Sequence, residues 1–405
     1  MANDLPLADV HILDFMWVMA GPGATRILAD YGATVVRIES THHLDALRTV
    51  TPFHNGQPGP ENSGFFQNLN AGKLGITLDF GTAAGRAVTL DLVRWADVVT
   101  ESFSPKAMRS WGFDYESLRQ VKPDIIMLST SLMGQSGPLA QFAGFGNLAA
   151  AISGFYSITG WPGRAPAGPF GAYTDTVAPR FTAAAILAAL EYRRRTGQGQ
   201  YIDQSQAEAA LHFLAPTLLD YTVNRRVQTQ VGNRDLHMAP HGVYAAAGED
   251  RWVAIAVGTH EQWQAFCDVI QQPDLVDDER FATSAWRRAH QHELDAIIAA
   301  WTRDRDANEI ETRLQARGVP ASAVQTMYDL YREPQLVHRG HFVELEHPMH
   351  DTTTVEGSRF KLSRTPACIE RAGPTLGRDN RYVLETILGY HPERIAEIEA
   401  LGVLS

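Results

Sequence analysis

Short apolar runs alternate with helical patterns through the first third of the chain. Residues 10–15, 33–38, 97–100 and 125–129 have the composition of buried strands, and helical stretches separate them. The first helix is expected near residues 24–31, after a turn rich in Gly and Pro. Strands that alternate with helices build βαβ units, so this rhythm predicts an α/β fold with a largely parallel, doubly wound sheet.

The most regular helical pattern covers residues 179–195, with the sequence PRFTAAAILAALEYRRR. It is rich in Ala and Leu, and its three final arginines suit the negative end of a helix dipole. A Gly-x-Gly break at 197–199 precedes a predicted strand at 201–205 and a further helix from Gln206. The α/β pattern is therefore expected to continue to about residue 221.

After residue 221 the sequence becomes polar and irregular, and then a hairpin of residues 242–246 and 251–257 is predicted around a Gly-Glu-Asp turn. We interpret residues 225–330 as a smaller α+β domain. Three helices are predicted within it, at 261–270, 284–303 and 307–317. Beyond it we predict short strands within 340–362 and helices at 382–388 and 392–401.

Composition narrows the class of protein. A chain of 405 residues favours two or three domains. The formal net charge of −11 argues against a nucleic-acid or anionic-membrane surface, because polyanions require an excess of Lys and Arg. The two cysteines, Cys267 and Cys368, do not make a disulfide framework or a metal site. Without a signal peptide or a long apolar stretch, a cytoplasmic location is expected.

The turn after the first strand partly matches a dinucleotide-binding fingerprint. Gly21 and Gly23 follow that strand, and Glu39 ends the next one. However, Arg26 occupies the third glycine position, and five residues lengthen a turn that should be tight. An ordinary βαβ turn is preferred, and an NAD-dependent enzyme remains the third-ranked interpretation.

Five segments, in order along the chain, resemble the family III CoA transferases, the group that contains formyl-CoA transferase, carnitine CoA-transferase and the α-methylacyl-CoA racemases. The resemblance runs from about residue 7 to residue 390. The segments are VHILDFMWVMAGPGATRILADYGATVVRIES (10–40), NLNAGKLGITLDF (68–80), ADVVTESFSP (96–105), MGQSGP (133–138) and AALEYRRRTGQGQYID (188–203).

This resemblance implies an architecture. The large domain would be Rossmann-like and built from both chain ends, residues 1–224 and 331–405, with residues 225–330 as the small α+β domain. Two subunits would form an interlocked-ring dimer, either of identical chains or with a related subunit.

The resemblance also implies a nucleophile, Asp175, within Gly171-Ala172-Tyr173-Thr174-Asp175. On its own, an aspartate near a helix start is more often a cap. A carboxylate that attacks an acyl-CoA thioester gives a mixed anhydride, which stays activated, whereas an alcohol would give a stable ester. CoA can then return to form an aspartyl-CoA thioester.

The racemase branch of the family needs a His as well as the Asp. In the corresponding region this chain has Phe145 and Gly146, so one of the two groups for proton exchange at the α-carbon is missing. Racemase activity is therefore rejected.

CoA contacts follow from the resemblance, position by position. They comprise Val18, Met19, Ala20, Arg37, Lys73, Leu78, Asp79, Phe80, Ser102, Phe103, Ser104, Arg109 and Phe145. Lys73 and Arg109 are candidate phosphate partners, with surface solvation as the alternative. The chain departs from the family at Ser40 and Ser110, where relatives have Arg.

The segment 237–257 resembles the branch that uses succinyl-CoA and dicarboxylic acids. Arg234, His237 and His241 are candidate partners for a distal carboxylate, although a packed or solvated His is the simpler interpretation. We expect succinyl-CoA as donor and L-malate, citramalate or mesaconate as acceptor, without a metal or a tightly bound cofactor. The main alternative is a non-catalytic subunit of a hetero-oligomeric transferase.

Overall fold

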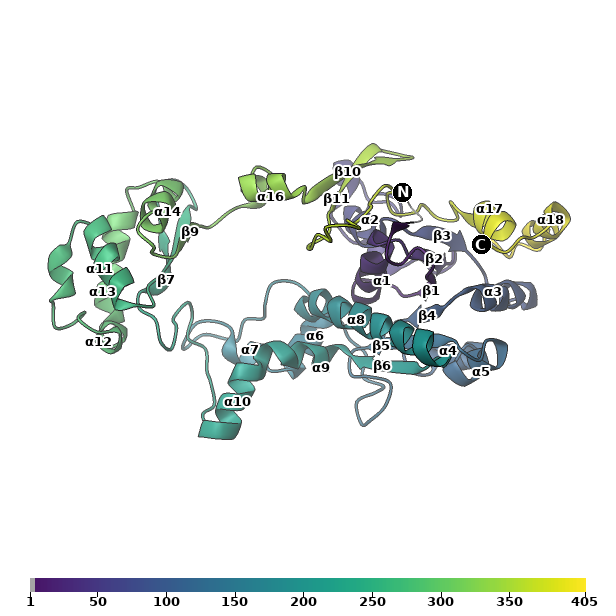
Figure 1. The fold of residues 1–405 in the computed structure, drawn as a ribbon, viewed down its shortest axis with the longest axis horizontal. Coiled ribbons are helices and arrows are strands. Elements are labelled where there is room, and N and C mark those ends of the chain that lie inside the picture. The colour runs from purple at the N-terminus through teal and green to yellow at the C-terminus, as the bar shows by residue number, and fades with distance from the viewer. Residues whose placement is uncertain (1–3) are drawn as a thin grey trace. The chain divides into compact units, whose positions relative to one another are not determined.

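A computed structural model describes residues 4–405; residues 1–3, which open the predicted large domain, lie outside the described part. The chain divides into two compact units, which are described separately (Figure 1). The large unit comprises the chain up to Tyr156 together with Gly168–Val227 and Gln335–Ser405. The small unit comprises Ser157–Ala167 and Gln228–Pro334.

The large unit contains a six-stranded sheet in which every strand pair is parallel. The strand order is β3-β2-β1-β4-β5-β6, which is the order of dinucleotide-binding sheets. The predicted parallel α/β fold is confirmed. The strands are β1 (His11–Phe15), β2 (Thr34–Glu39), β3 (Leu74–Thr77), β4 (Val98–Glu101), β5 (Ile126–Ser131) and β6 (Tyr201–Ser205).

Both faces of this sheet are covered, which explains why its strands have continuous apolar sequences. Ile12 belongs to a core formed with α1 (Ala20–Asp30) and α8 (Tyr173–Thr196). Its neighbour Leu13 belongs to the opposite core, which includes residues of α3, α5 and α18. The further helices that contribute here are α3 (Ala83–Trp95), α4 (Ala107–Trp111), α5 (Tyr115–Val121) and α18 (Pro392–Ala400).

The C-terminal segment protects the edge strand β3. The carboxylate of Asp379 accepts a hydrogen bond from the Gly75 amide at 2.8 Å, and the Asp379 amide donates to the Gly75 carbonyl at 3.0 Å. A Cβ on Gly75 would lie 2.6 Å from Pro374, so only glycine allows this approach. Other elements of this segment are β10 (Phe342–His347), β11 (Asp351–Glu356), α17 (Asn380–Tyr382) and a π-helix (Val383–Ile387).

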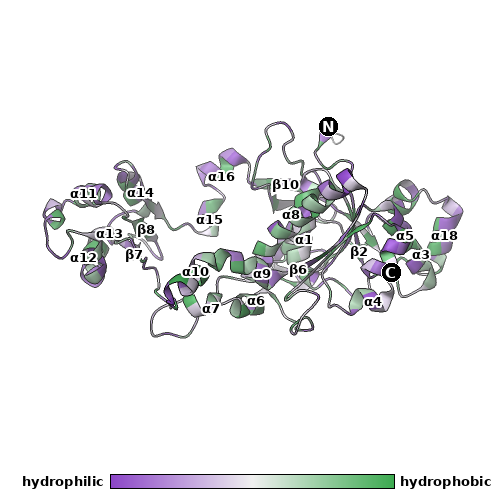
Figure 2. Ribbon diagram, turned by 60° about the horizontal axis from the view of Figure 1, so that its bottom comes forward, coloured by the Kyte–Doolittle hydropathy of each residue, from purple (hydrophilic) through white to green (hydrophobic). Residues whose placement is uncertain are grey.

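Helix α8 begins six residues before the predicted start at Pro179. Pro179 is inside the helix rather than at its first position. Proline has no amide hydrogen, so it leaves the carbonyl of Asp175, four residues earlier, without its helical donor. The middle of α8 is apolar and its last turn is hydrophilic (Figure 2). Further helices are α2 (Gly64–Asn70), α6 (Gly146–Ile152), α7 (Phe155–Ile158), α9 (Gln206–Leu211) and α10 (Ala215–Asn224), of which α6 and α9 contact α8.

The small unit has an antiparallel sheet in the order β7-β8-β9 and a core around Trp263. The predicted hairpin is confirmed, whereas the predicted helix at 284–303 is two helices that break at His290. The elements are β7 (His241–Ala245), β8 (Trp252–Ala256), β9 (Ala321–Ala323), α11 (His260–Val269), α12 (Ser284–Ala289), α13 (Gln291–Thr302), α14 (Ala307–Gln315) and α15 (Met327–Leu330). Helix α16 (Pro334–Arg339) follows, and all of it except Pro334 belongs to the large unit. Within residues 4–405, no helix is both long and apolar enough to cross a membrane.

Candidate active site

Three side chains accept hydrogen bonds from the backbone of the loop after β1. The amide of Met16 donates to Asp14 at 2.9 Å, that of Trp17 to the Ser102 hydroxyl at 3.0 Å, and that of Val18 to Asp45 at 2.9 Å. Val18 has a φ of +63°, which is strained for a β-branched residue. Such strain persists only where the surroundings over-determine the backbone, and it marks this loop as a candidate functional element.

Two buried cations support this loop from inside: Arg37, a predicted CoA contact, and Lys73, a predicted phosphate partner. Arg37 is 0% exposed and donates to the Met16 carbonyl and to Asp45, both at 2.5 Å. Lys73 is also 0% exposed and donates to Asp14, at 3.1 Å, and to the Pro22 carbonyl. Burial lowers the pKa of Lys73 to about 8, against the attraction of Asp14. Their complete burial is inconsistent with a phosphate contact.

Asp175 lies in the first turn of α8 and is 6% exposed. It does not cap the helix, because the N-cap is Ala172 and no side chain there accepts a cap hydrogen bond. Burial raises the pKa of Asp175 to about 6, opposed only by a hydrogen bond from the Gly146 amide. No cation contributes to this shift, so the buried carboxylate lacks a counter-ion.

Gly146, the first residue of α6, determines how close this helix comes to Asp175. A Cβ at Gly146 would lie 2.8 Å from both Cγ and Oδ1 of Asp175. The two helix starts are also joined by the Thr174 hydroxyl, which donates to the Gly146 carbonyl at 3.1 Å. Only glycine therefore permits the observed position of the carboxylate.

Asp175 borders a cavity of about 300 Å³ in the large unit. The cavity includes Met19 of the strained loop, so the predicted nucleophile and one predicted CoA contact share one space. It also contains three guanidinium groups and two further acids. Its lining is Met19, Gly23, Arg26, Ile27, Asp30, Phe65, Asn68, Leu69, Asp175, Thr176, Pro179, Arg180, Glu356, Ser358, Arg359 and Phe360.

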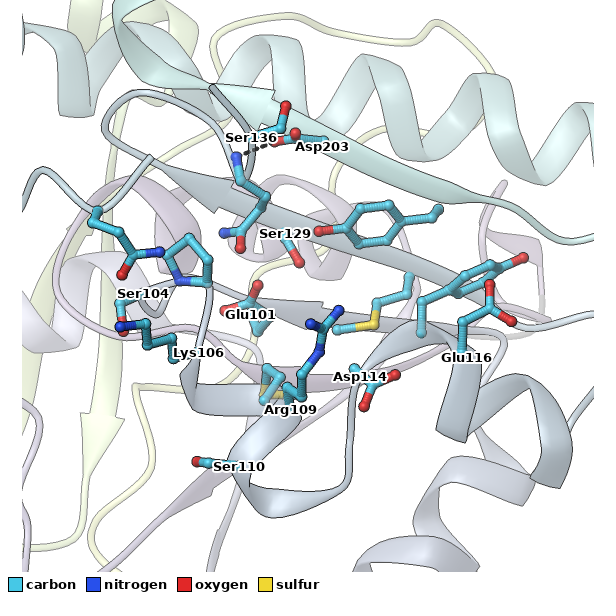
Figure 3. A pocket seen from close by; sticks show the side chains of 17 residues that line it. Glu101, Ser104, Lys106, Arg109, Ser110, Asp114, Glu116, Ser129, Ser136 and Asp203 are labelled. Carbon is cyan, nitrogen blue, oxygen red and sulfur yellow. Dashed lines mark hydrogen bonds between the residues drawn. The ribbon is translucent and has the colours of Figure 1, made fainter. Parts of the chain in front are cut away.

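A second cavity, of about 760 Å³, lies beside the carboxyl end of β4 (Figure 3). Ser104 and Arg109 line it, as do Lys106 and Ser110. Arg109 points into it from α4 in Figure 3. Glu101 is 2% exposed there, and burial raises its pKa to about 7. The cavity thus combines two cations with a carboxyl group that titrates near neutrality.

Other predicted CoA contacts have mainly packing roles in this structure. Leu78 is 0% exposed, and Phe80 packs edge-on against Phe15 and Trp111. The Ser102 hydroxyl accepts a hydrogen bond from the Trp17 amide, and Phe103 packs edge-on against the Trp17 ring. The remaining three have different surroundings: Ala20 is buried, Asp79 accepts from the Gly81 amide at 2.9 Å, and Phe145 is 65% exposed.

In the small unit, Arg234 and His241 line one cavity of about 650 Å³. His241 contacts the Asn233 carbonyl through Nδ1 at 2.6 Å. His237 is outside the lining of that cavity, and its backbone amide donates to Asp235 at 2.7 Å. The structure thus brings two of the three predicted substrate residues together. Across residues 4–405, no cluster of His, Cys, Asp and Glu is suited to hold a metal ion.

The sequence interpretation missed Gly146, Glu101, Arg180 and Arg359. Glu101 had a signal, since it directly follows the strand predicted at 97–100, at the carboxyl end where open α/β sheets bind ligands. Arg180 directly follows Pro179 and was included only as part of the predicted helix 179–195. Gly146 was noted only for the absence of a His.

Comparison with known proteins agrees with this arrangement. The family model described as CoA-transferase family III matches residues 7–380. The succinyl-CoA–D-citramalate CoA-transferase of Chloroflexus aurantiacus is 31% identical over 400 residues, covering 98% of both chains. The succinate–glutarate CoA-transferase of Agrobacterium fabrum is 34% identical over 383 residues, covering 94% of this chain and 95% of the relative.

Among solved structures, a CAIB/BAIF family protein from Brucella suis matches with a TM-score of 0.86 and 28% identity. The match covers 95% of this chain and 99% of that protein. The family model and the two relatives span nearly the whole length, including the loop after β1 and the start of α8. The chain belongs to CoA-transferase family III.

Proposed function

We propose that this enzyme transfers CoA from succinyl-CoA to a dicarboxylic acid, with Asp175 as covalent nucleophile. The observation that carries the proposal is the position of Asp175, a nearly buried carboxylate without a counter-ion that borders a cavity beside the strained loop. A desolvated carboxylate is more nucleophilic than a hydrated or ion-paired one. The names of the relatives support succinyl-CoA and dicarboxylates as the substrate classes.

The reaction begins when an Asp175 oxygen attacks the thioester carbonyl of succinyl-CoA. The new C–O bond gives a mixed anhydride, the C–S bond breaks, and CoA leaves as thiolate. The thiolate then attacks the Asp175 carbonyl carbon, which releases succinate and leaves an aspartyl-CoA thioester. The acceptor carboxylate repeats these two steps in reverse order, so CoA leaves on the acceptor and Asp175 is regenerated as a carboxylate.

The anhydride must be protected from water, because hydrolysis would waste the free energy of the thioester. Two features support such protection: Asp175 is only 6% exposed, and the cavity that it borders is small, at about 300 Å³. The carboxylate must also be ionised to attack. With a pKa of about 6, its reactive form is dominant at neutral pH and is lost as the pH falls through 6.

The larger cavity is proposed to hold the nucleotide part of CoA. Lys106 and Arg109 supply positive charge for phosphates, and the site lies beside a strand's carboxyl end, where open α/β sheets bind ligands. Asp114 and Glu116 line the same cavity and would repel phosphates, so the phosphates are expected on the side of the two cations. This replaces the earlier assignment of phosphate binding to Lys73.

We also propose that two copies of the chain assemble, as the interlocked rings implied by the family resemblance require. Supporting this, α10 presents large apolar side chains to solvent within one chain, including Leu218, Leu219 and Val223, of which Val223 is 75% exposed. A second copy that covers this helix would remove these side chains from water. Light scattering on the purified chain should give twice the mass of one chain, and a monomer would contradict the assembly.

The covalent step is tested by incubating the purified chain with succinyl-CoA and quenching for peptide mass analysis. A hydroxylamine- or borohydride-trapped derivative on the peptide with Asp175, absent from Asp175→Ala, is expected. If the chain forms no derivative with succinyl-CoA or with other acyl-CoAs, the proposal fails, and the chain is instead a non-catalytic subunit that needs a partner.

A further inference from the structure

Arg180 is an unpaired cation in the cavity of Asp175. It lies on α8, five residues after Asp175, and its side chain is exposed to the cavity mouth. Its guanidinium donates to the Thr176 carbonyl of its own helix. Among the ion pairs of residues 4–405, none involves Arg180, so most of its five donors are free to bind an acid.

The other two guanidinium groups of this cavity are already engaged. Arg26 is 2% exposed, pairs with Asp30 at 2.6 Å, and donates to the Glu356 carbonyl at 2.8 Å. Arg359 pairs with the Glu356 carboxylate at 2.6 Å. A carboxylate that bound either of them would have to displace an internal acid, whereas binding to Arg180 displaces none.

Arg180 is also not the counter-ion of Asp175. The pKa of Asp175 is raised by burial, and no cation acts against that shift. Five residues advance a helix by about 7.5 Å and turn it by about 140° beyond one full turn, so the two side chains leave α8 in different directions. Both nevertheless line the same cavity of about 300 Å³. An acid that reacts at Asp175 can therefore extend its second carboxylate through this cavity towards Arg180.

We propose that Arg180 binds the distal carboxylate of the dicarboxylic acyl group and so selects dicarboxylic over monocarboxylic substrates. This inference rests on the proposed transferase function and adds to it the residue that determines specificity. A guanidinium binds a carboxylate through two parallel hydrogen bonds, which fix the orientation of the acyl chain as well as its charge. The same contact serves the succinyl donor and the acceptor, because both are diacids that occupy Asp175 in turn.

The test compares Arg180→Met with wild type in steady-state transfer from succinyl-CoA to glutarate and from butyryl-CoA to valerate. Loss of one charge-assisted contact should lower kcat/KM for the dicarboxylate pair by roughly 10- to 100-fold. The monocarboxylate pair should change by less than about 3-fold, so the ratio of the two rates is the readout. Arg180→Lys keeps the charge without the planar fork and should recover part of the preference.

Arg194→Met is the matched control. Arg194 lies on the same helix, is exposed, pairs with Glu191 and does not line the cavity, so this variant should keep the wild-type ratio. Equal melting temperatures of the three variants would exclude misfolding. A wild-type ratio in Arg180→Met overturns the inference, and Arg234→Met and Arg359→Met then show whether either of those cations carries the preference instead. Absence of transfer by the wild type with every pair would mean that the proposed function itself has failed.

Discussion

Gly146→Ala tests whether the close approach of α6 fixes the reactive position of Asp175. The added Cβ would lie 2.8 Å from Cγ and Oδ1 of Asp175, whereas ordinary contact begins at 3.4 Å. The carboxylate would therefore have to retreat by about 0.6 Å, and its hydrogen bond from the Gly146 amide would be distorted. A displacement of about 1 Å at a reacting group can cost on the order of 100-fold in rate. We expect kcat to fall by roughly 10- to 100-fold.

The matched control is Gly64→Ala. Gly64 and Gly146 are each the first residue of a seven-residue helix, but a Cβ on Gly64 would meet nothing closer than 3.6 Å. Both variants therefore replace a helix-start glycine by alanine, and only one of them crowds Asp175. Gly64→Ala should keep wild-type kcat, and its melting temperature should stay within the usual range for a surface substitution.

The assay has two parts. Initial rates of transfer from succinyl-CoA measure kcat, and the rate of the trapped derivative on Asp175 in a single turnover measures the covalent step. Gly146→Ala should slow both by the same factor while far-UV circular dichroism is unchanged. If Gly146→Ala forms the derivative at the wild-type rate, the close approach is not needed for nucleophilic attack and the reasoning is refuted.

Three further substitutions test other parts of the site. Asp175→Asn should abolish transfer and stabilise the fold by roughly 1–3 kcal/mol at pH 8. In the wild type, the raised pKa of Asp175 means that the folded state favours the protonated carboxyl group. This contribution to stability is complete below pH 3.8 and is lost as the pH rises through about 6, whereas the asparagine variant does not lose it. Its stability gap to wild type should therefore close between pH 8 and pH 4, and a constant gap in denaturant titrations would contradict this. Arg109→Met should raise KM for succinyl-CoA about 10-fold with little change in kcat, and a change confined to kcat would exclude a phosphate contact. Lys73→Met should lower the free energy of unfolding, measured by urea denaturation, by about 3–5 kcal/mol, because it removes the cation that pairs with the buried Asp14. The double variant Lys73→Met/Asp14→Asn should recover part of that loss.

The fold could be predicted from the sequence because its signals are local. The buried strands of the sheet are continuous apolar runs, and β6 was predicted at the residues that it occupies. The start of α8 was not, because Pro179 is typical of a first helical position. The preceding turn, Tyr173–Ala178, contains no strong helix signal, and it is instead held by contacts with α6, such as the bond from Thr174 to Gly146.

Site residues could be predicted from the sequence only where a family motif assigned a role to their position. Asp175 and Met19 were assigned in this way, and the structure places both on one cavity. Arg37 and Lys73 were misinterpreted, because a sequence does not reveal that Asp45 and Asp14 approach them inside the protein. Arg180 was missed for the opposite reason, since its lack of an acidic partner becomes visible only once every neighbour is placed.

Two pairs of buried carboxyl groups in the large unit differ in whether a cation lies beside them. Glu39 and Asp14 are buried next to Arg37, Arg48 or Lys73, and the pKa of each is lowered, to about 2 for Glu39. Both belong to the network that supports the loop after β1, and they line neither of the two cavities of the large unit. Asp175 and Glu101 are buried without a cation, and their pKa values rise to about 6 and 7.

Each unpaired carboxyl group borders a cavity, one small and one large enough for part of a nucleotide. A buried carboxylate without a partner reduces stability, so selection for folding alone would favour its replacement by a neutral residue. Its persistence beside a cavity is explained when the missing partner is supplied by a substrate or when the ionised form must react. Under the proposed mechanism Asp175 fits the second explanation, because a neighbouring cation would stabilise the carboxylate and weaken its attack on the thioester.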